Sequence, residues 1–94
     1  MENAIQNLVI DPEFRDLIPP LDEAERTKLE ASLQKDGCLD SLKFWCDGER
    51  QVLLDGNNRH EICTRLSIPY RVEEVSSVTT RYEAIQWMID LQLS

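Results

Sequence analysis

The residues of this chain whose types and spacing could do chemistry stand in one run, DGNNRHE, at positions 55–61. The run follows the apolar segment 52–54, which predicts a strand, and precedes a predicted short helix. The first N–H groups of a helix lack partners within it, and the helix dipole makes that end positive, so such a junction binds anions readily. The position of the run therefore predicts an anion site.

The residues of the run suit this role individually. Gly56 lets the backbone approach a phosphate closely or adopt a positive φ. Asn57 or Asn58 can cap the helix and leave an amide free for a ligand. Arg59 supplies a planar, permanently charged fork that matches phosphate oxygens. The plain alternative is a polar turn followed by a helix cap, because the chain has neither a Walker lysine nor a GxGxxG pattern.

The composition is that of one ordinary globular domain, with 41% hydrophobic and 30% charged residues. The formal net charge is −8, from 18 acidic and 10 basic residues, and no Lys/Arg run is present. Because affinity for duplex DNA comes largely from Lys and Arg neutralising phosphates, the composition argues against DNA contact by this domain. We expect any DNA contact to come from regions outside this chain.

The chain lacks the features of an exported or membrane protein. No segment approaches the roughly 20 apolar residues of a membrane span. The N-terminus has neither a basic nor an apolar signal region, so we expect a cytoplasmic protein that does not enter a membrane. Three cysteines without a CxxC pair, and a single histidine, favour reduced thiols over a structural zinc site.

The local signals predict seven elements in the order β-α-β-β-α-β-α. Asp22 with Glu25 forms a capping box for a helix that ends at Gly37. Asp47-Gly48 predicts a hairpin turn, and Thr80 can cap the last helix. The strands are expected at 8–10, 42–46, 51–54 and 70–75, and the helices at 22–36, 57–67 and 81–93. The fold class is α/β (α+β), a small mixed β-sheet with about three helices on one side.

Apolar spacing predicts which helix faces are buried. The first helix should pack through one stripe and the last helix through another, and the two tryptophans, Trp45 and Trp87, are expected in the core or at a dimer interface. The residues of the two stripes are Leu21, Ala24, Leu29 and Leu33, then Tyr82, Ile85, Met88, Ile89 and Gln92.

Three stretches, DGCLDSLKFW, VLLDGNNRHEIC and YEAIQWMIDLQLS, resemble the ParB/sulfiredoxin superfamily. The resemblance is closest to the ParB-like N-terminal domains (also labelled ParB-like nuclease domains) of plasmid, phage and mobile-element proteins, and it spans about residues 5–94. It implies that residues 1–94 form a single ParB-like N-terminal domain. Because relatives continue into basic residues after this point, we expect the chain to be truncated from a longer DNA-associated protein.

The resemblance also implies a ligand and its site. Nucleotide phosphates would bind the loop-to-helix motif, the segment after the first helix would complete the pocket, and one position near the last helix would contribute. The ligand would be a nucleoside triphosphate, CTP or ATP, with Mg2+, and Glu61 is the candidate metal ligand. The implied binding positions are Gly56, Asn57, Asn58, Arg59 and His60 in the motif, Gly37, Asp40 and Ser41 in the segment, and Gln92 near the end.

Two differences from the family's sequence pattern reduce the number of functions that the resemblance allows. Sulfiredoxins carry a catalytic cysteine where this chain has Asn57, so sulfiredoxin chemistry is excluded. Chromosomal ParB proteins have an arginine-rich motif, of which only Arg59 remains here.

Three functions stay open. The first is a nucleotide-binding domain of a partition or regulatory protein. The second is a nuclease, a phosphotransferase or a weak nucleoside triphosphatase, with His60, Glu61 and Asp55 as catalytic candidates. The third is an interaction domain with a decayed pocket, which could form a homodimer.

Overall fold

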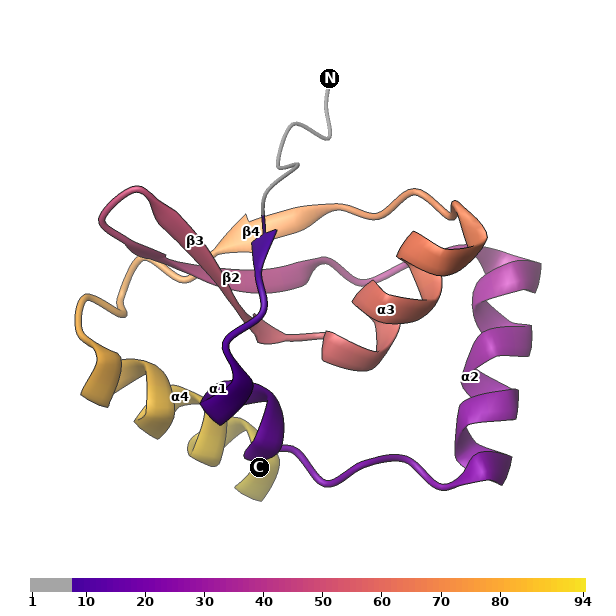
Figure 1. The fold of residues 1–94 in the computed structure, drawn as a ribbon, viewed down its shortest axis with the longest axis horizontal. Coiled ribbons are helices and arrows are strands. Elements are labelled where there is room, and N and C mark those ends of the chain that lie inside the picture. Colours follow the sequence, from indigo (N-terminus) through magenta and orange to yellow (C-terminus); the bar gives the residue numbers. More distant parts are fainter. Residues whose placement is uncertain (1–7) are drawn as a thin grey trace.

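The computed structural model describes residues 8–94, which form four helices and one four-stranded sheet (Figure 1). The sheet order is β1-β3-β2-β4, with parallel pairing of β1 to β3 and of β2 to β4, and antiparallel pairing of β2 to β3. The mixed α/β class is therefore confirmed. The elements are β1 (Leu8–Val9), α1 (Pro12–Asp16), α2 (Glu23–Asp36), β2 (Leu42–Asp47), β3 (Arg50–Asp55), α3 (Asn57–Leu66), β4 (Val72–Glu74) and α4 (Arg81–Leu93).

The predicted hairpin and the predicted caps of α2 and α4 are confirmed. Strands β2 and β3 pair up to Asp47 and Arg50, and Gly48 in the turn has a φ of 65°. The α2 capping box joins the Asp22 carboxylate to the Glu25 backbone N–H and the Glu25 carboxylate to the Asp22 N–H. Thr80 accepts a hydrogen bond from the backbone of the first turn of α4. These signals need only a few neighbouring residues, which is why the sequence carries them.

Helix α1 was not predicted. The Asp11 carboxylate caps it by accepting hydrogen bonds from the N–H groups of Glu13 at 2.9 Å and Phe14 at 3.2 Å, and Pro12 begins it. Its five residues are too few to show a helical period. The helix instead depends on its cap and on the complete burial of the Phe14 ring.

The core covers both faces of the sheet, so the prediction of helices on one side was wrong. Val52 and Leu54 of β3 pack with Phe14 and Met88 in one cluster. Leu53 lies between them and points to the opposite face, yet it is only 1% exposed. Strand β3 is the inner strand between β1 and β2, which explains why it is buried on both sides.

The predicted buried face of α4 is only partly correct, because Met88 is buried and Ile85 packs against the core as predicted, but other residues of the stripe are exposed. Ala84 and Met88 are fully buried, whereas Tyr82 is 72% exposed and Ile89 is also exposed. Apolar residues surround much of this helix, so their spacing did not select one face. Trp87 is half-buried against the core.

The predictions for Trp45 and for the buried face of α2 agree more closely with the structure. Trp45 lies in the core, as predicted. In α2, Leu33 is buried and Leu29 half-buried, but Ala24 is exposed. The helix therefore packs through only part of the stripe that its apolar spacing predicts.

Ionic contacts join two pairs of helices. Arg81 at the start of α4 donates to both oxygens of Asp11, at 3.0 and 3.1 Å, and lies 4.5 Å above the centre of the Phe14 ring. Figure 1 accordingly shows α1 beside α4, and α2 beside α3 on the other side of the molecule. Between α2 and α3, Arg65 donates to Glu30 at 2.5 Å. Within residues 8–94, none of the helices is long and apolar enough to cross a membrane.

Candidate anion site at the start of helix α3

Helix α3 begins at a glycine that no other residue could easily replace. Gly56 is the residue before the helix and has a φ of 108°. A Cβ at this position would lie 2.5 Å from the Leu42 side chain, closer than any real contact. The positive φ, which the sequence predicted, and the close packing against Leu42, which it did not, both require glycine.

The first turn of α3 is uncapped. Asn57 and Asn58 are its first two residues, so the prediction that one of them caps the helix was wrong, and no side chain of residues 8–94 replaces them. The first turn also contains no acidic residue. Its outward N–H groups and the positive end of the helix dipole therefore remain available to a ligand.

Asn57 carries the clearest sign of a missing partner. Its Nδ2 atom is shielded from solvent and has no hydrogen-bond acceptor among the residues described. A buried amide donor without an acceptor costs about 1–3 kcal/mol, so such groups are rare without a function or an unseen partner. The same side chain lines two hollows on either side of it.

The two hollows meet at Arg15, Asn57 and Asn58. The smaller one, of about 450 Å3, lies against the connection between α1 and α2. The larger one, of about 550 Å3, lies between α2 and α3. Both fall in the size range of small-molecule sites. The remaining lining residues are Asp16, Ile18, Pro19 and Pro20 in the smaller hollow, and Ile10, Arg26, His60, Glu61, Thr64 and Arg65 in the larger one.

The charge around these hollows is opposite to that of the whole chain. Three arginines line them against two carboxylates, Asp16 and Glu61, although the chain as a whole carries a net charge of −8. Glu61 forms ion pairs with Arg26 and, at 3.2 Å, with Arg65. Among residues 8–94, the Arg15 guanidinium pairs with its sequence neighbour Asp16, at 3.2 Å, and the side chain is 55% exposed. The guanidinium of Arg15 is therefore the one most easily turned toward a ligand.

The sequence predicted that Arg59 binds phosphate, but its side chain contacts other groups of the protein. It donates to the Asp40 carbonyl at 3.0 Å and forms an ion pair with Asp55 at 3.4 Å, and it lines neither of the two hollows. Its side chain is only 20% exposed. Arg59 therefore fastens the segment between α2 and β2 to the start of α3.

The other predicted binding positions lie in three separate places. His60 lines the larger hollow beside the two asparagines, whereas Gly37, Asp40 and Ser41 line neither hollow, although Arg59 brings their segment close to α3. Gln92 lies with α1 instead, where its Nε2 donates to the Leu17 carbonyl at 3.1 Å.

The predicted acid–base residues are all engaged by neighbours. Burial lowers the pKa of His60, and its ring meets the Tyr70 ring edge-on, with the centres 5.6 Å apart. Asp55 pairs with an arginine and Glu61 with two. The described residues contain no group of three or more His, Cys, Asp or Glu side chains that could hold a metal ion.

Sequence reasoning missed Arg15, Arg26 and the proline connection between α1 and α2. Pro19 and Pro20 exclude a continuous helix here, but they give no sign that the chain returns at this point to the start of α3. Arg15 lies on the helix that was not predicted.

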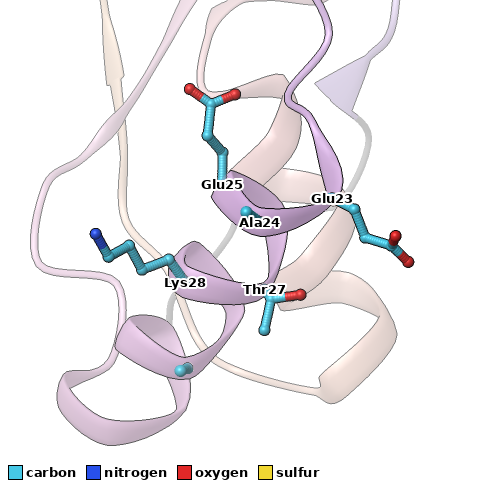
Figure 2. A pocket seen from close by; sticks show the side chains of 6 residues that line it. Glu23, Ala24, Glu25, Thr27 and Lys28 are labelled. Atoms are coloured by element: carbon cyan, nitrogen blue, oxygen red, sulfur yellow. The ribbon is translucent and has the colours of Figure 1, made fainter.

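A third hollow, over the outer face of α2, does not have the features of a site. All of its lining residues come from the first turns of this one helix. Figure 2 shows the side chains of Glu23, Glu25 and Lys28 pointing away from one another. These charges converge on no common ligand position, so the face is an ordinary solvated helix surface.

Comparison of the sequence with protein-family models and with curated proteins gives no match. The ParB-like resemblance therefore rests on the three stretches quoted above.

Proposed function

We propose that this chain is a ParB-like domain that binds a nucleotide through its phosphates at the start of α3, within a DNA-associated partition or regulatory protein of a plasmid, phage or mobile element. The observation that carries the proposal is the uncapped first turn of α3, where the orphaned Asn57 amide adjoins an arginine-lined hollow. The resemblance of the DGNNRHEIC stretch to the family's nucleotide motif supports it further.

The lining residues suggest how the ligand would lie. Phosphate oxygens would accept hydrogen bonds from the first-turn N–H groups and from Asn57 Nδ2, with charge supplied by Arg15 and Arg26. The wall formed by Ile18, Pro19 and Pro20 is apolar and suits a base or ribose. This division puts the phosphates toward α2 and the nucleoside toward α1.

Magnesium would be held mainly by the nucleotide. Mg2+ in such sites takes most of its ligands from phosphate oxygens and water, and needs only one or two carboxylates. Asp16 and Glu61 are the lining carboxylates, and Glu61 is already paired with two arginines. Asp16 is paired with Arg15 and lines only the smaller hollow, away from the proposed phosphate side, so a bound ion would take its ligands mainly from phosphate oxygens and water.

The described residues favour binding over catalysis. A nuclease or phosphotransferase needs a free base or a cluster of metal ligands. Asp55 and Glu61 are held by arginines, and no such cluster occurs within residues 8–94. His60 is the remaining base candidate, and the burial that lowers its pKa also makes its imidazole a weaker base.

A thermal-shift panel tests the proposal. CTP, ATP and GTP are each added with and without Mg2+, and at least one should raise the melting temperature, since a ligand at 100 times its Kd stabilises by about 2.7 kcal/mol. Arg15→Gln should raise the Kd of that nucleotide about tenfold, because one charge-assisted contact is lost.

Arg50→Gln is the matched control. Arg50 is a comparably exposed arginine in the β2–β3 hairpin, and it pairs with Asp47 at 3.7 Å. Its variant should bind like the wild type. Equal weakening in both variants would mean that only overall charge matters, and the site at α3 would be rejected.

Self-association is a second candidate function, favoured by the exposed apolar residues of α4. Tyr82, Ile89 and Leu93 lie on one side of the helix, and Leu93 is 81% exposed. A second copy of the chain could cover this face in a symmetric dimer. Light scattering would show a dimer that Ile89→Glu converts to a monomer. A wild-type monomer at high concentration would exclude this function.

A further inference from the structure

Two cysteines that stand far apart in the sequence come together beside α3. Cys63 lies on α3 and is 1% exposed. Cys38 follows α2, is half-buried, and packs against the cluster of Leu33, Ile62 and Cys63. Burial raises the pKa of Cys63 to about 11, and the nearby Cys38 thiol adds to this rise. The two cysteines therefore lie in the same packed cluster.

We propose that Cys38 and Cys63 are a redox modification site, at which a reversible disulfide joins the segment between α2 and β2 to α3. Both residues are free thiols in the structure. Cys38 is partly open to solvent, whereas Cys63 is enclosed and has Cys38 as its neighbouring thiol. Cys46, the third cysteine, is exposed on β2 and lies next to Glu74 rather than to a thiol.

The oxidant would be a small disulfide of the oxidised-glutathione class. The Cys38 thiolate attacks one sulfur of this disulfide, forming a mixed disulfide and releasing one small thiol. The Cys63 thiolate then attacks the Cys38 sulfur and releases the second small thiol. Two protein thiols are oxidised, one small disulfide is reduced to two thiols, and the two protein protons leave to the solvent or the released thiols. Because Cys63 ionises only at high pH, the second step should accelerate as the pH rises.

The bond would add a covalent link to a connection that noncovalent contacts now hold. The segment is held to α3 by the Arg59 hydrogen bond to the Asp40 carbonyl, and the Cys38 thiol also contacts that carbonyl at 3.5 Å. A covalent link between positions 38 and 63 would close a loop and reduce the entropy of the unfolded chain. This inference does not depend on nucleotide binding, since it concerns only these thiols.

Peptide mapping after oxidation tests the proposal on the intact chain. The protein is incubated under native conditions with oxidised glutathione, alkylated and digested with trypsin. Cleavage after Lys and Arg places the three cysteines in separate peptides, at 36–43, 44–50 and 60–65. The expected product is the linked pair 36–43 with 60–65, lighter by two hydrogen atoms than the two free peptides. The melting temperature of the oxidised protein should exceed that of the reduced protein by more than about 5 °C.

Two variants separate a specific bridge from general thiol reactivity. Cys46→Ser should keep both the linked peptide and the melting shift. Cys38→Ser, a change at a half-buried position, should lose both. Glutathione attached to Cys38 without the linked pair, links that include the 44–50 peptide in equal amount, or a lower melting temperature after bridging would each overturn the proposal.

Discussion

The contact between Asp11 and Arg81 allows the sharpest test of how the fold is held together. Asp11 caps α1 with two backbone hydrogen bonds and also binds the first residue of α4, seventy positions away in the sequence. Its side chain is 10% exposed. One carboxylate therefore fixes the helix that carries Arg15 and joins it to the C-terminal helix.

Replacing Asp11 with alanine should cost about 2 kcal/mol of unfolding free energy. Loss of a helix cap accounts for about 1 kcal/mol. Loss of the pair with Arg81 contributes about 1 kcal/mol more, a value kept low because the guanidinium is 44% exposed and partly screened. For a domain of this size, the melting temperature should fall by roughly 8–16 °C. Urea unfolding followed by the fluorescence of buried Trp45 measures the change.

The pH dependence of this contribution has a definite sign. The Arg81 hydrogen bonds hold the pKa of Asp11 below its ordinary value of 3.8. A carboxylate with a lowered folded pKa stabilises the protein fully above the unfolded value and loses this effect as the pH falls through the folded value. The stability difference between wild type and Asp11→Asn should therefore be constant at neutral pH and shrink below about pH 4.

A double-mutant cycle identifies the partner. The losses of unfolding free energy caused by Asp11→Ala and Arg81→Gln should be less than additive in the double variant, because each change removes the same contact. Arg50→Gln, at an exposed pair in the hairpin, should change stability by less than about 0.5 kcal/mol and should add independently to Asp11→Ala. A loss below about 0.5 kcal/mol for Asp11→Ala, or an equal loss at pH 3 and pH 7, would refute the reasoning.

Three further predictions concern the start of α3. Gly56→Ala should destabilise by about 2 kcal/mol or more in urea unfolding, because its positive φ and a core leucine both exclude a Cβ; Gly48→Ala, which has a positive φ but open space, should cost less, and equal costs would contradict the packing argument. Arg59→Ala should lower the melting temperature by several degrees but leave the nucleotide-induced shift in place, since its donors are used within the protein; loss of the shift at unchanged stability would make Arg59 a ligand residue. Glu61→Gln should tighten nucleotide binding about threefold in calorimetry, because a negative charge leaves the arginine-lined hollow; weaker binding only in the presence of Mg2+ would instead support Glu61 as a metal ligand.

The parts of the fold that the sequence predicted are those that local residues determine. The capping box of Asp22 and Glu25, the hairpin at Gly48 and the cap at Thr80 each involve residues within a few positions of one another. The glycine at the start of α3 was predicted for the same reason: a strand-to-helix junction with positive φ leaves few other choices.

What the sequence could not predict depends on contacts between distant segments. Helix α1 exists because Phe14 is buried and Asp11 caps it, and neither effect produces a periodic pattern. The direction of the Arg59 side chain depends on where the Asp40 carbonyl lies, which the tertiary fold decides. The arginines of the hollow come from three helices, so only the folded chain brings them together.

The central claim is that phosphates of a nucleotide bind the uncapped first turn of α3. Backbone amide spectra of 15N-labelled protein, recorded during titration with CTP or ATP and Mg2+, test it most directly. The account predicts the largest shift changes at the amides of residues 57–59 and around Arg15, with the side-chain amide of Asn57 also shifting as its Nδ2 gains an acceptor. An unchanged spectrum at millimolar nucleotide, or shifts confined to α4 or the β2–β3 hairpin, would contradict it.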